Sequence, residues 1–287
     1  MTETKERAWE GVAPPKDSGV LRFLYHNPIG RLLLRLLSAR WVSRLVGRFL
    51  DSRLSKPLIR RFVKSNEIDL SQFESDRFRC FNDCFCRKIK DGLRPIDSDP
   101  AALIAPCDGL LSAYRIKEDT VLPIKQSAYS IRSLLGDDAS WERFLGGTCL
   151  IFRLCVDHYH RYCYPANGEK SENVFIKGRL HTVRPIALAA CPVFLENCRE
   201  YTFLNTDDFG TVAQIEVGAM LVGKIKNHHG ARAVTRGEEK GMFLYGGSTV
   251  ILLLERDRVT LPNEFFTNTE QGLETPVRMG EEIGLKR

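Results

Sequence analysis

Apolar residues are densest near the start of the chain, where arginines interrupt them at helical spacing. Within residues 41–50, apolar side chains fill one half of a helical wheel, and small or basic side chains fill the other. The apolar half consists of Trp41, Val42, Leu45, Val46, Phe49 and Leu50. This period predicts an amphipathic helix. Such a helix can lie in a membrane interface or pack on a larger domain with its arginines in water. The apolar content exceeds one buried stripe, which favours the membrane interface.

The pattern changes after Pro95 to short β-rich runs separated by turn residues. Residues 213–217 alternate between apolar and polar, which predicts a half-buried strand, whereas the continuous apolar run 248–254 predicts a strand buried on both faces. Asp108-Gly109 between two apolar runs predicts a hairpin, and a helix is expected within residues 128–145. The fold class is therefore α+β, with a mostly β, barrel-like or sandwich domain behind an N-terminal amphipathic helical region.

These changes of pattern divide the chain into segments. We expect a mobile polar tail at residues 1–17, a helical membrane-associating region at 18–64, a connecting helical segment at 65–96, and a β-rich catalytic domain at 97–287. No secretory signal peptide is evident, and no run approaches the roughly 20 apolar residues that a membrane-spanning helix needs.

Charge and cysteine content narrow the surroundings of the protein. The net charge is +6, and residues 18–64 hold eleven Lys or Arg against the single acid Asp51. This local excess indicates an anionic surface, either lipid headgroups or nucleic acid. Nine scattered cysteines, an odd number in a chain of 287 residues, indicate a reducing compartment rather than a disulfide scaffold. The cluster Cys80, Cys84 and Cys86 lacks a second ligand pair for structural zinc, so no metal site is expected.

The segment Gly246-Gly247-Ser248-Thr249 stands directly before the buried strand. Taken alone it is more typical of a tight turn, because glycine readily adopts positive φ. The functional alternative is a scissile peptide bond. A glycine on the acyl side leaves its carbonyl open to attack, and the hydroxyl of Ser248 can attack it.

Three further features could carry chemistry. Asp108 could be a plain turn residue or the acid that orients a catalytic histidine. His158 and His160, two residues apart on an expected strand, could serve as metal ligands, as a general base or as structural histidines. No carboxylate or cysteine set that completes a metal site is visible. His228-His229-Gly230 is typical of an exposed turn, with substrate contact as the alternative.

Together and in this order, these segments resemble the phosphatidylserine decarboxylase family from about residue 20 to 262. The family's Ser-Pro-x-Asp-Gly element corresponds to Ala105-Pro106-Cys107-Asp108-Gly109, and Asp-Tyr-His-Arg to His158-Tyr159-His160-Arg161. Its Val-Gly-Ala element is Val217-Gly218-Ala219, and the run before the cleavage motif is Gly237-Glu238-Glu239-Lys240-Gly241-Met242-Phe243. The cleavage motif is Gly246-Gly247-Ser248-Thr249. Many members carry a second histidine where this chain has Cys163, which leaves the division of acid–base roles open.

The resemblance implies a proenzyme that cuts itself between Gly247 and Ser248 into a β chain, 1–247, and an α chain, 248–287. It implies that Ser248 becomes a covalent pyruvoyl cofactor, with His160 as base and Asp108 holding it. The reaction converts phosphatidylserine to phosphatidylethanolamine and CO₂, because the pyruvoyl group accepts the electrons left by decarboxylation. It further implies a carboxy-lyase that is peripheral to the cytoplasmic face of the cell membrane and forms a homodimer.

Other functions fit parts of the pattern. A pyruvoyl decarboxylase could act on another serine-headgroup lipid or a soluble amino acid, and a β-rich peripheral membrane protein could bind without catalysis. A serine hydrolase lacks its Gly-x-Ser-x-Gly motif. Nucleic-acid binding has only the basic stretch in its favour, without interleaved aromatics.

Overall fold

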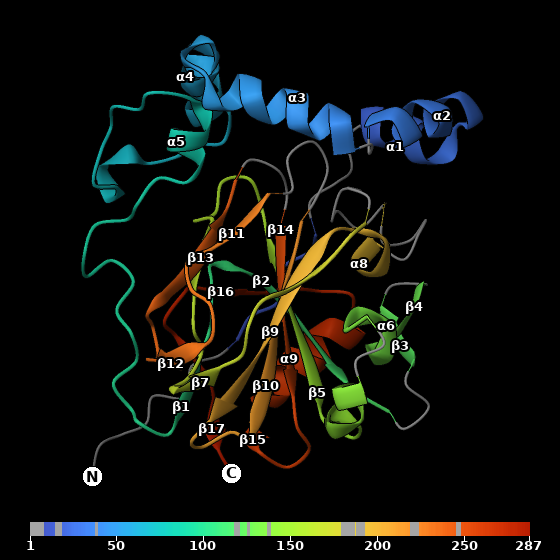
Figure 1. Cartoon of the computed structure of the whole chain (residues 1–287), viewed down its shortest axis with the longest axis vertical. Helices are drawn as coiled ribbons and strands as arrows, with labels where there is room; N and C mark the ends of the chain where they lie inside the picture. The colour runs from blue at the N-terminus through green and yellow to red at the C-terminus, as the bar shows by residue number, and fades with distance from the viewer. Residues whose placement is uncertain are drawn as a thin grey trace.

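A layer of helices lies over one end of a β-rich body (Figure 1). The computed structural model describes residues 9–14, 19–37, 40–117, 121–124, 127–136, 139–178, 187, 193–218, 224–244 and 248–287. The mixed α+β fold, in which the body is mostly β, confirms the predicted fold class.

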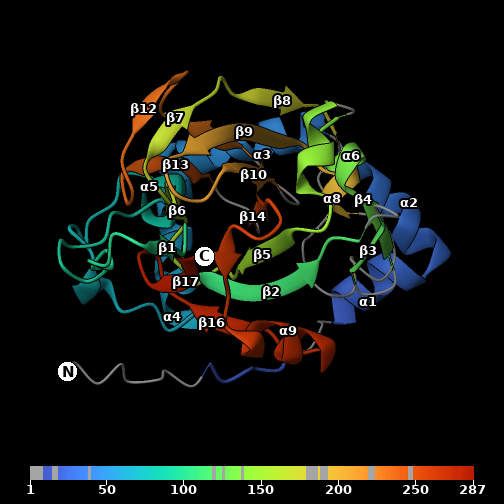
Figure 2. The same ribbon diagram turned by 90° about the horizontal axis from the view of Figure 1, so that it is seen from below.

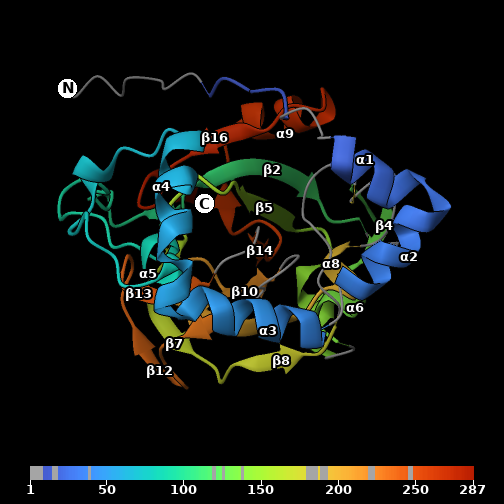
Figure 3. The same cartoon turned by 90° about the horizontal axis from the view of Figure 1, so that it is seen from above.

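The helical layer is formed by four short helices in sequence, α1 (Gly19–His26), α2 (Pro28–Leu37), α3 (Arg40–Asp51) and α4 (Lys56–Ser65), with the 3-10 turn Arg53–Ser55 between the last two. Seen from above, they form an arc across the end of the body (Figure 3). No helix among the described residues is long and apolar enough to cross a membrane. After α4 the chain descends through the 3-10 turn Leu70–Gln72 and the short helix α5 (Phe81–Phe85).

The apolar half of α3 does not face a single partner. Leu50 is buried, whereas Trp41, Leu45 and Phe49 are 55%, 56% and 44% exposed. Most of the exposed large apolar side chains of the described residues belong to this same layer: Val20, Phe23, Ile29, Leu32, Leu33, Trp41, Leu45, Phe49, Leu54 and Leu58. The layer therefore packs on the body with one edge and presents a wide apolar surface with the other.

A nine-stranded sheet forms the centre of the body, in the order β12-β7-β9-β10-β14-β5-β2-β16, with β8 pairing to β9. Every pairing in it is antiparallel. The strand bounds are β2 (Gly109–Arg115), β5 (Thr148–Leu154), β7 (Gly168–Lys170), β8 (Val174–Ile176), β9 (Arg199–Thr206), β10 (Thr211–Val217), β12 (Arg232–Val234), β14 (Ser248–Leu254) and β16 (Thr275–Val277).

Both faces of this sheet are covered, as Figure 2 shows from below. One face carries two small sheets, β11-β13-β6 and β1-β17-β15. Their strands are β1 (Ala102–Ile104), β6 (Arg161–Cys163), β11 (Ile225–Asn227), β13 (Glu239–Phe243), β15 (Val259–Thr260) and β17 (Glu282–Lys286). The other face carries the hairpin β3 (Val121–Ile124) and β4 (Ser127–Ser130), with α6 (Ile131–Leu134), the 3-10 helix Ala139–Phe144 and α8 (Val193–Glu196). Helix α9 (Asn263–Glu270) packs near β2.

The alternation of side chains along β14 explains this arrangement. Ile251 and Leu253 belong to the core on the α6 and α8 side, whereas Val250, Leu252 and Leu254 belong to the core under the small sheets. Because successive side chains of a strand point to opposite faces, an uninterrupted apolar run is what a sheet covered on both faces requires. The prediction that residues 248–254 form a doubly buried strand is confirmed.

The helix expected within residues 128–145 is present as the short α6, and a 3-10 helix follows it. Three other details of the sequence interpretation were wrong. Asp108-Gly109 does not close a hairpin, because β1 pairs with β17 and β2 pairs with β5 and β16 in another sheet. Residues 213–217 are buried on both faces rather than half-buried. His158 and His160 precede β6 and do not share a strand.

Part of the predicted N-terminal tail lies against the body. Within residues 9–14, Val12 exchanges backbone hydrogen bonds with Glu274, and the ring of Trp9 lies 4.9 Å from that of Phe265. Residues 1–8 and 15–17 of the predicted tail fall outside the described residues.

Candidate active site

Ser248 is the first residue of β14 and lies opposite Leu154, the last residue of β5. Residues paired across an antiparallel ladder point to the same face. Leu154 belongs to the core under the small sheets, so the Ser248 side chain faces β6 and β13 rather than α6 and α8. Its hydroxyl is buried and has no hydrogen-bond partner in the described part of the chain. A buried polar atom without a partner is uncommon and suggests a functional role.

The predicted scissile peptide joins Ser248 to Gly247, which lies outside the described residues with Tyr245 and Gly246. The chain on its two sides is well anchored. The amide of Phe243 donates to the carbonyl of His160 at 2.9 Å, and that of Leu244 donates to the carbonyl of Lys224 at 3.0 Å. Downstream, β14 pairs along its length with β5 and β10. The described residues before and after the candidate cleavage segment are thus each fixed by backbone hydrogen bonds.

His160 lies next to the end of β13, where its carbonyl accepts from the amide of Phe243, and it is fully buried. Its Nδ1 is 2.9 Å from the carbonyl oxygen of His158, so Nδ1 carries a proton when it donates to that oxygen. Its Nε2 is buried and has no partner among the described residues. In this tautomer Nε2 is an unengaged base.

Aromatic packing shields the His160 imidazole from solvent. The ring of Phe85, itself fully buried, lies 4.0 Å from the imidazole between centroids. Burial lowers the pKa of His160 to about 3, because desolvation disfavours the charged imidazolium. The imidazole is therefore neutral at physiological pH and able to accept a proton, although its low pKa makes it a weak base until a partner approaches.

Asp108 does not hold His160 in this structure, contrary to the predicted triad. Both carboxylate oxygens of Asp108 are bound by Arg94, with Nε to Oδ1 at 2.7 Å and a terminal nitrogen to Oδ2 at 2.6 Å. The amide of Met279 donates to Oδ1 at 2.9 Å. Nδ1 of His160 instead takes the carbonyl of His158. The sequence contained no signal for this exchange, because Arg94 lies outside every recognised motif.

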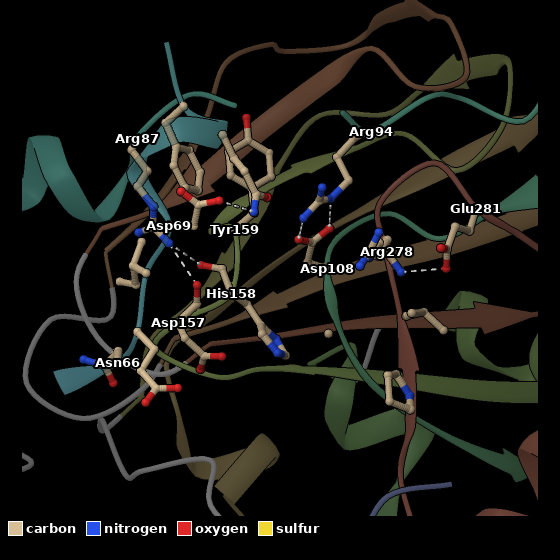
Figure 4. A pocket seen from close by; sticks show the side chains of 17 residues that line it. Asn66, Asp69, Arg87, Arg94, Asp108, Asp157, His158, Tyr159, Arg278 and Glu281 are labelled. Carbon is tan, nitrogen blue, oxygen red and sulfur yellow. Dashed lines mark hydrogen bonds and ion pairs between the residues drawn. The ribbon is translucent and has the colours of Figure 1, made fainter. Parts of the chain in front are cut away.

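Asp108 belongs instead to the wall of a neighbouring pocket of about 600 Å³ (Figure 4). Asp157, His158 and Tyr159 line its other side, and Arg87 and Arg278 contribute cations. Neither His160 nor Ser248 reaches this wall. The guanidinium of Arg87 connects the pocket to His160, since it lies 3.5 Å from the carbonyl oxygen of His158, the same oxygen that Nδ1 of His160 contacts.

The other residues left open by the sequence fall in different surroundings. Burial raises the pKa of the Cys163 thiol to about 12, so this thiol stays protonated at neutral pH and cannot serve there as a base. His228 lies at the surface with Nε2 2.8 Å from Glu239, which also binds Arg161 at 2.8 Å. His229 contacts the hydroxyl of Tyr164 at 3.3 Å.

The structure also brings together a group that the sequence interpretation missed. The potential metal-ligating atoms of Cys155, Asp157 and His158 lie within 4.8 Å of one another. Two of these residues already have partners. Nδ1 of His158 accepts from the amide of Cys155 at 3.2 Å, and Arg153 donates to the thiol of Cys155 at 3.3 Å. The sequence feature that indicates this group is the spacing Cys-x-Asp-His.

Comparison with known proteins identifies the family. The family model for phosphatidylserine decarboxylase matches residues 81–285. A curated relative named phosphatidylserine decarboxylase proenzyme 2, from Clostridium acetobutylicum, is 42% identical over 93% of this chain and 92% of its own length. Two further relatives are named phosphatidylserine decarboxylase proenzyme. The one from Clostridium perfringens is 41% identical over 93% of this chain and 92% of its own length. The one from Fusobacterium nucleatum is 37% identical over 93% of this chain and 91% of its own length. This chain belongs to the phosphatidylserine decarboxylase family.

Membership in the phosphatidylserine decarboxylase family confirms the resemblance read from the motifs. The family model begins at Phe81, the first residue of α5, and spans the whole β body. Helices α1–α4 lie before it, yet the full-length relatives align over most of this region as well. Both Ser248 and His160 lie within the matched range.

Proposed function

We propose that this carboxy-lyase converts phosphatidylserine to phosphatidylethanolamine and CO₂, using a pyruvoyl group that it makes from Ser248. The observation that carries the proposal is the pair of buried, unpartnered atoms on one face of the sheet, the hydroxyl of Ser248 and Nε2 of His160. Both atoms are buried and have no hydrogen-bond partner among the described residues, so each is free to bond to a reacting group.

Maturation follows from these two groups. Nε2 of His160 takes the hydroxyl proton as Ser248 attacks the carbonyl of Gly247, and the peptide becomes an ester. Removal of the α-proton of Ser248 then expels the upstream carboxylate by β-elimination. Hydrolysis of the resulting dehydroalanine releases ammonia and leaves the pyruvoyl group. The cut divides the 287 residues into chains of 247 and 40 residues, which stay together because β14 pairs on both sides.

The surroundings of Ser248 fit a pyruvoyl group. Its side chain faces the apolar core under the small sheets, and β14 fixes its backbone. When present, this group supplies an electrophilic carbonyl for the substrate amine and an acceptor for the electrons released with CO₂. His160 is positioned to move a proton at this place. Asp108 contributes to the site by binding Arg94, which lines the same pocket wall.

The exposed apolar surface of α1–α4 supports a membrane as the second partner. Ten large apolar side chains of this layer are exposed, together with the basic excess of residues 18–64. Amphipathic helices of this composition bind in the headgroup region, where they bring the active site to its lipid. We infer a peripheral association with the cytoplasmic face of the cell membrane, whose anionic lipids attract cations.

Intact mass measurement of the purified protein tests the proposal. The expected result is two chains that meet between Gly247 and Ser248, the smaller one blocked to N-terminal sequencing, with decarboxylation of phosphatidylserine in vesicles. Ser248→Ala should give one uncut, inactive chain. Ser112→Ala is the matched control, a buried serine two strands away, and should be cut normally. A wild-type chain that stays whole while decarboxylating would overturn the assignment of Ser248.

A further inference from the structure

A second pocket, of about 520 Å³, opens next to the helical layer and meets the Asp108 pocket at Arg87, which lines both. Its walls come from four places that are distant in sequence: the end of α3, the segment 74–88, Arg161 of β6, and the strands β11 and β13 with their flanks. Met242 and Leu244 of its wall also pack on the apolar cluster of α3, α4 and α5. The pocket therefore adjoins both the helical layer and the approach to Ser248.

The pocket is strongly basic. Seven cationic side chains line it: Arg77, Arg79, Arg87, Lys88, Arg161, Lys224 and Lys226. Its three acids are already engaged. Asp51 accepts from Asn82 at 2.7 Å, Glu74 binds Lys88 at 2.8 Å, and Asp83 accepts from the backbone of Arg79 at 3.1 Å.

Four of the cations form no ion pair within the described part of the chain: Arg77, Arg79, Lys224 and Lys226. All four residues are exposed at the pocket. Like charges gathered at one hollow repel one another, and a bound anion relieves that repulsion. Lys and Arg together are the side chains that hold phosphate oxygens.

The position of the pocket, beside the exposed apolar side chains at the end of α3, indicates which anion it binds. Asp51 ends α3, and its neighbours Phe49 and Leu54 are 44% and 77% exposed. A membrane that receives these apolar side chains places its phosphate layer at the mouth of the pocket. Ser248 and His160 do not line the pocket, which separates it from the two residues proposed to act on the substrate.

We propose that this pocket binds the phosphate of an anionic phospholipid other than the reacting substrate, and so docks the enzyme on anionic membranes. The inference rests on the proposed membrane association of α1–α4. It adds a specific headgroup site to a surface that would otherwise bind by apolar insertion alone.

The test compares wild type with Lys224→Gln/Lys226→Gln on two kinds of vesicle, pure phosphatidylcholine and phosphatidylcholine mixed with phosphatidylglycerol. Wild type should prefer the mixed vesicles. The double variant should lose roughly 30-fold of binding to them, the effect expected for two cations close to an anionic surface. It should keep its binding to pure phosphatidylcholine and its self-cleavage. Lys117→Gln/Lys177→Gln removes the same charge from two exposed positions outside the pocket and should keep the full preference.

The outcomes separate the possible failures. If wild type binds neither vesicle, the membrane association itself fails. If the double variant retains the full preference for mixed vesicles, the pocket is not a lipid site. Titration with inorganic phosphate distinguishes the source of the anion. Phosphate that binds wild type tightly without weakening its preference for mixed vesicles would overturn the lipid assignment in favour of a free phosphate site.

Discussion

The helical layer and the β body depart from the usual distribution of polar and apolar groups in opposite directions. The layer exposes Ile29, Leu45 and Leu54, whereas the body buries ions. Lys240 on β13 donates to both carboxylate oxygens of Glu216 on β10 at 2.6 Å, and neither side chain is exposed. Each departure is costly in water alone. The body thus supplies its own partners for its buried ions, whereas the exposed apolar side chains of the layer fit the membrane association proposed above.

Hydrogen bonds connect several polar groups of the body into one network that includes Glu216 and Lys240. Asn227 donates to Glu216 at 3.2 Å and to Glu200 at 2.8 Å, and it accepts from the hydroxyl of Tyr162 at 3.0 Å. These bonds join β11 and β6 to the central sheet. Since His160 directly precedes β6, the same bonds help to hold the proposed base in place.

The largest effect is expected from breaking the buried pair. In a Ser248→Ala background, which keeps the chain whole, Lys240→Met should lower the free energy of unfolding by roughly 3–5 kcal/mol, because Glu216 remains buried without its counter-ion. Urea denaturation measures this. Replacing both partners, as Lys240→Met/Glu216→Leu, should restore most of the loss. Lys286→Met, which breaks the exposed pair with Asp208, should cost about 1 kcal/mol or less. A Lys240→Met loss no larger than that of Lys286→Met would mean that the buried pair contributes nothing special.

An intermediate effect should appear on acidification. The pKa of His160 is about 3 in the folded chain, against an ordinary value of 6.5. Between these values the unfolded chain binds a proton that the folded chain excludes, so stability falls as pH falls from about 6.5 towards 4. His160 should contribute about 1 kcal/mol per pH unit there. Urea denaturation across this range, again in the Ser248→Ala background, should give a shallower fall for His160→Gln. Identical slopes for the two chains would contradict a neutral, buried His160.

The smallest effect on stability is expected in the helical layer. Trp41→Ser/Leu45→Ser/Phe49→Ser should change the free energy of unfolding by only about 0.5 kcal/mol per site, because these side chains already lie in water. Vesicle binding should nevertheless weaken at least about tenfold, since less apolar surface enters the interface. Phe175→Ser alters an equally exposed aromatic on β8 and should leave vesicle binding unchanged. Tight binding by the triple variant would show that the layer does not contact the membrane.

The sequence predicted those features that depend on local pattern. The apolar run 248–254 required a strand covered on both faces, and β14 is one. The amphipathic period of residues 41–50 required a helix, and α3 spans it. Motif order predicted the family, which the comparisons confirm.

What the sequence could not predict depends on partners distant in the chain. Gln214 and Glu216 looked like the solvent side of a strand, but Lys240 neutralises Glu216 from another sheet and makes its burial possible. Asp108 looked like the partner of His160, but Arg94 binds it with two hydrogen bonds. Short-range spacing does not reveal which of two cationic or imidazole partners a buried carboxylate will choose.

The position of β14 has a consequence for the lifetime of the cut enzyme. The cut proposed before Ser248 would leave the new end in the middle of the central sheet, where residues 248–254 pair with β5 and residues 249–254 pair with β10. The small chain could then not leave without opening the sheet on both sides. We therefore expect its association not to depend on dilution and copies of the enzyme not to exchange their small chains. Activation by this cut would be permanent for each molecule, and a damaged pyruvoyl end could not be replaced from a neighbour.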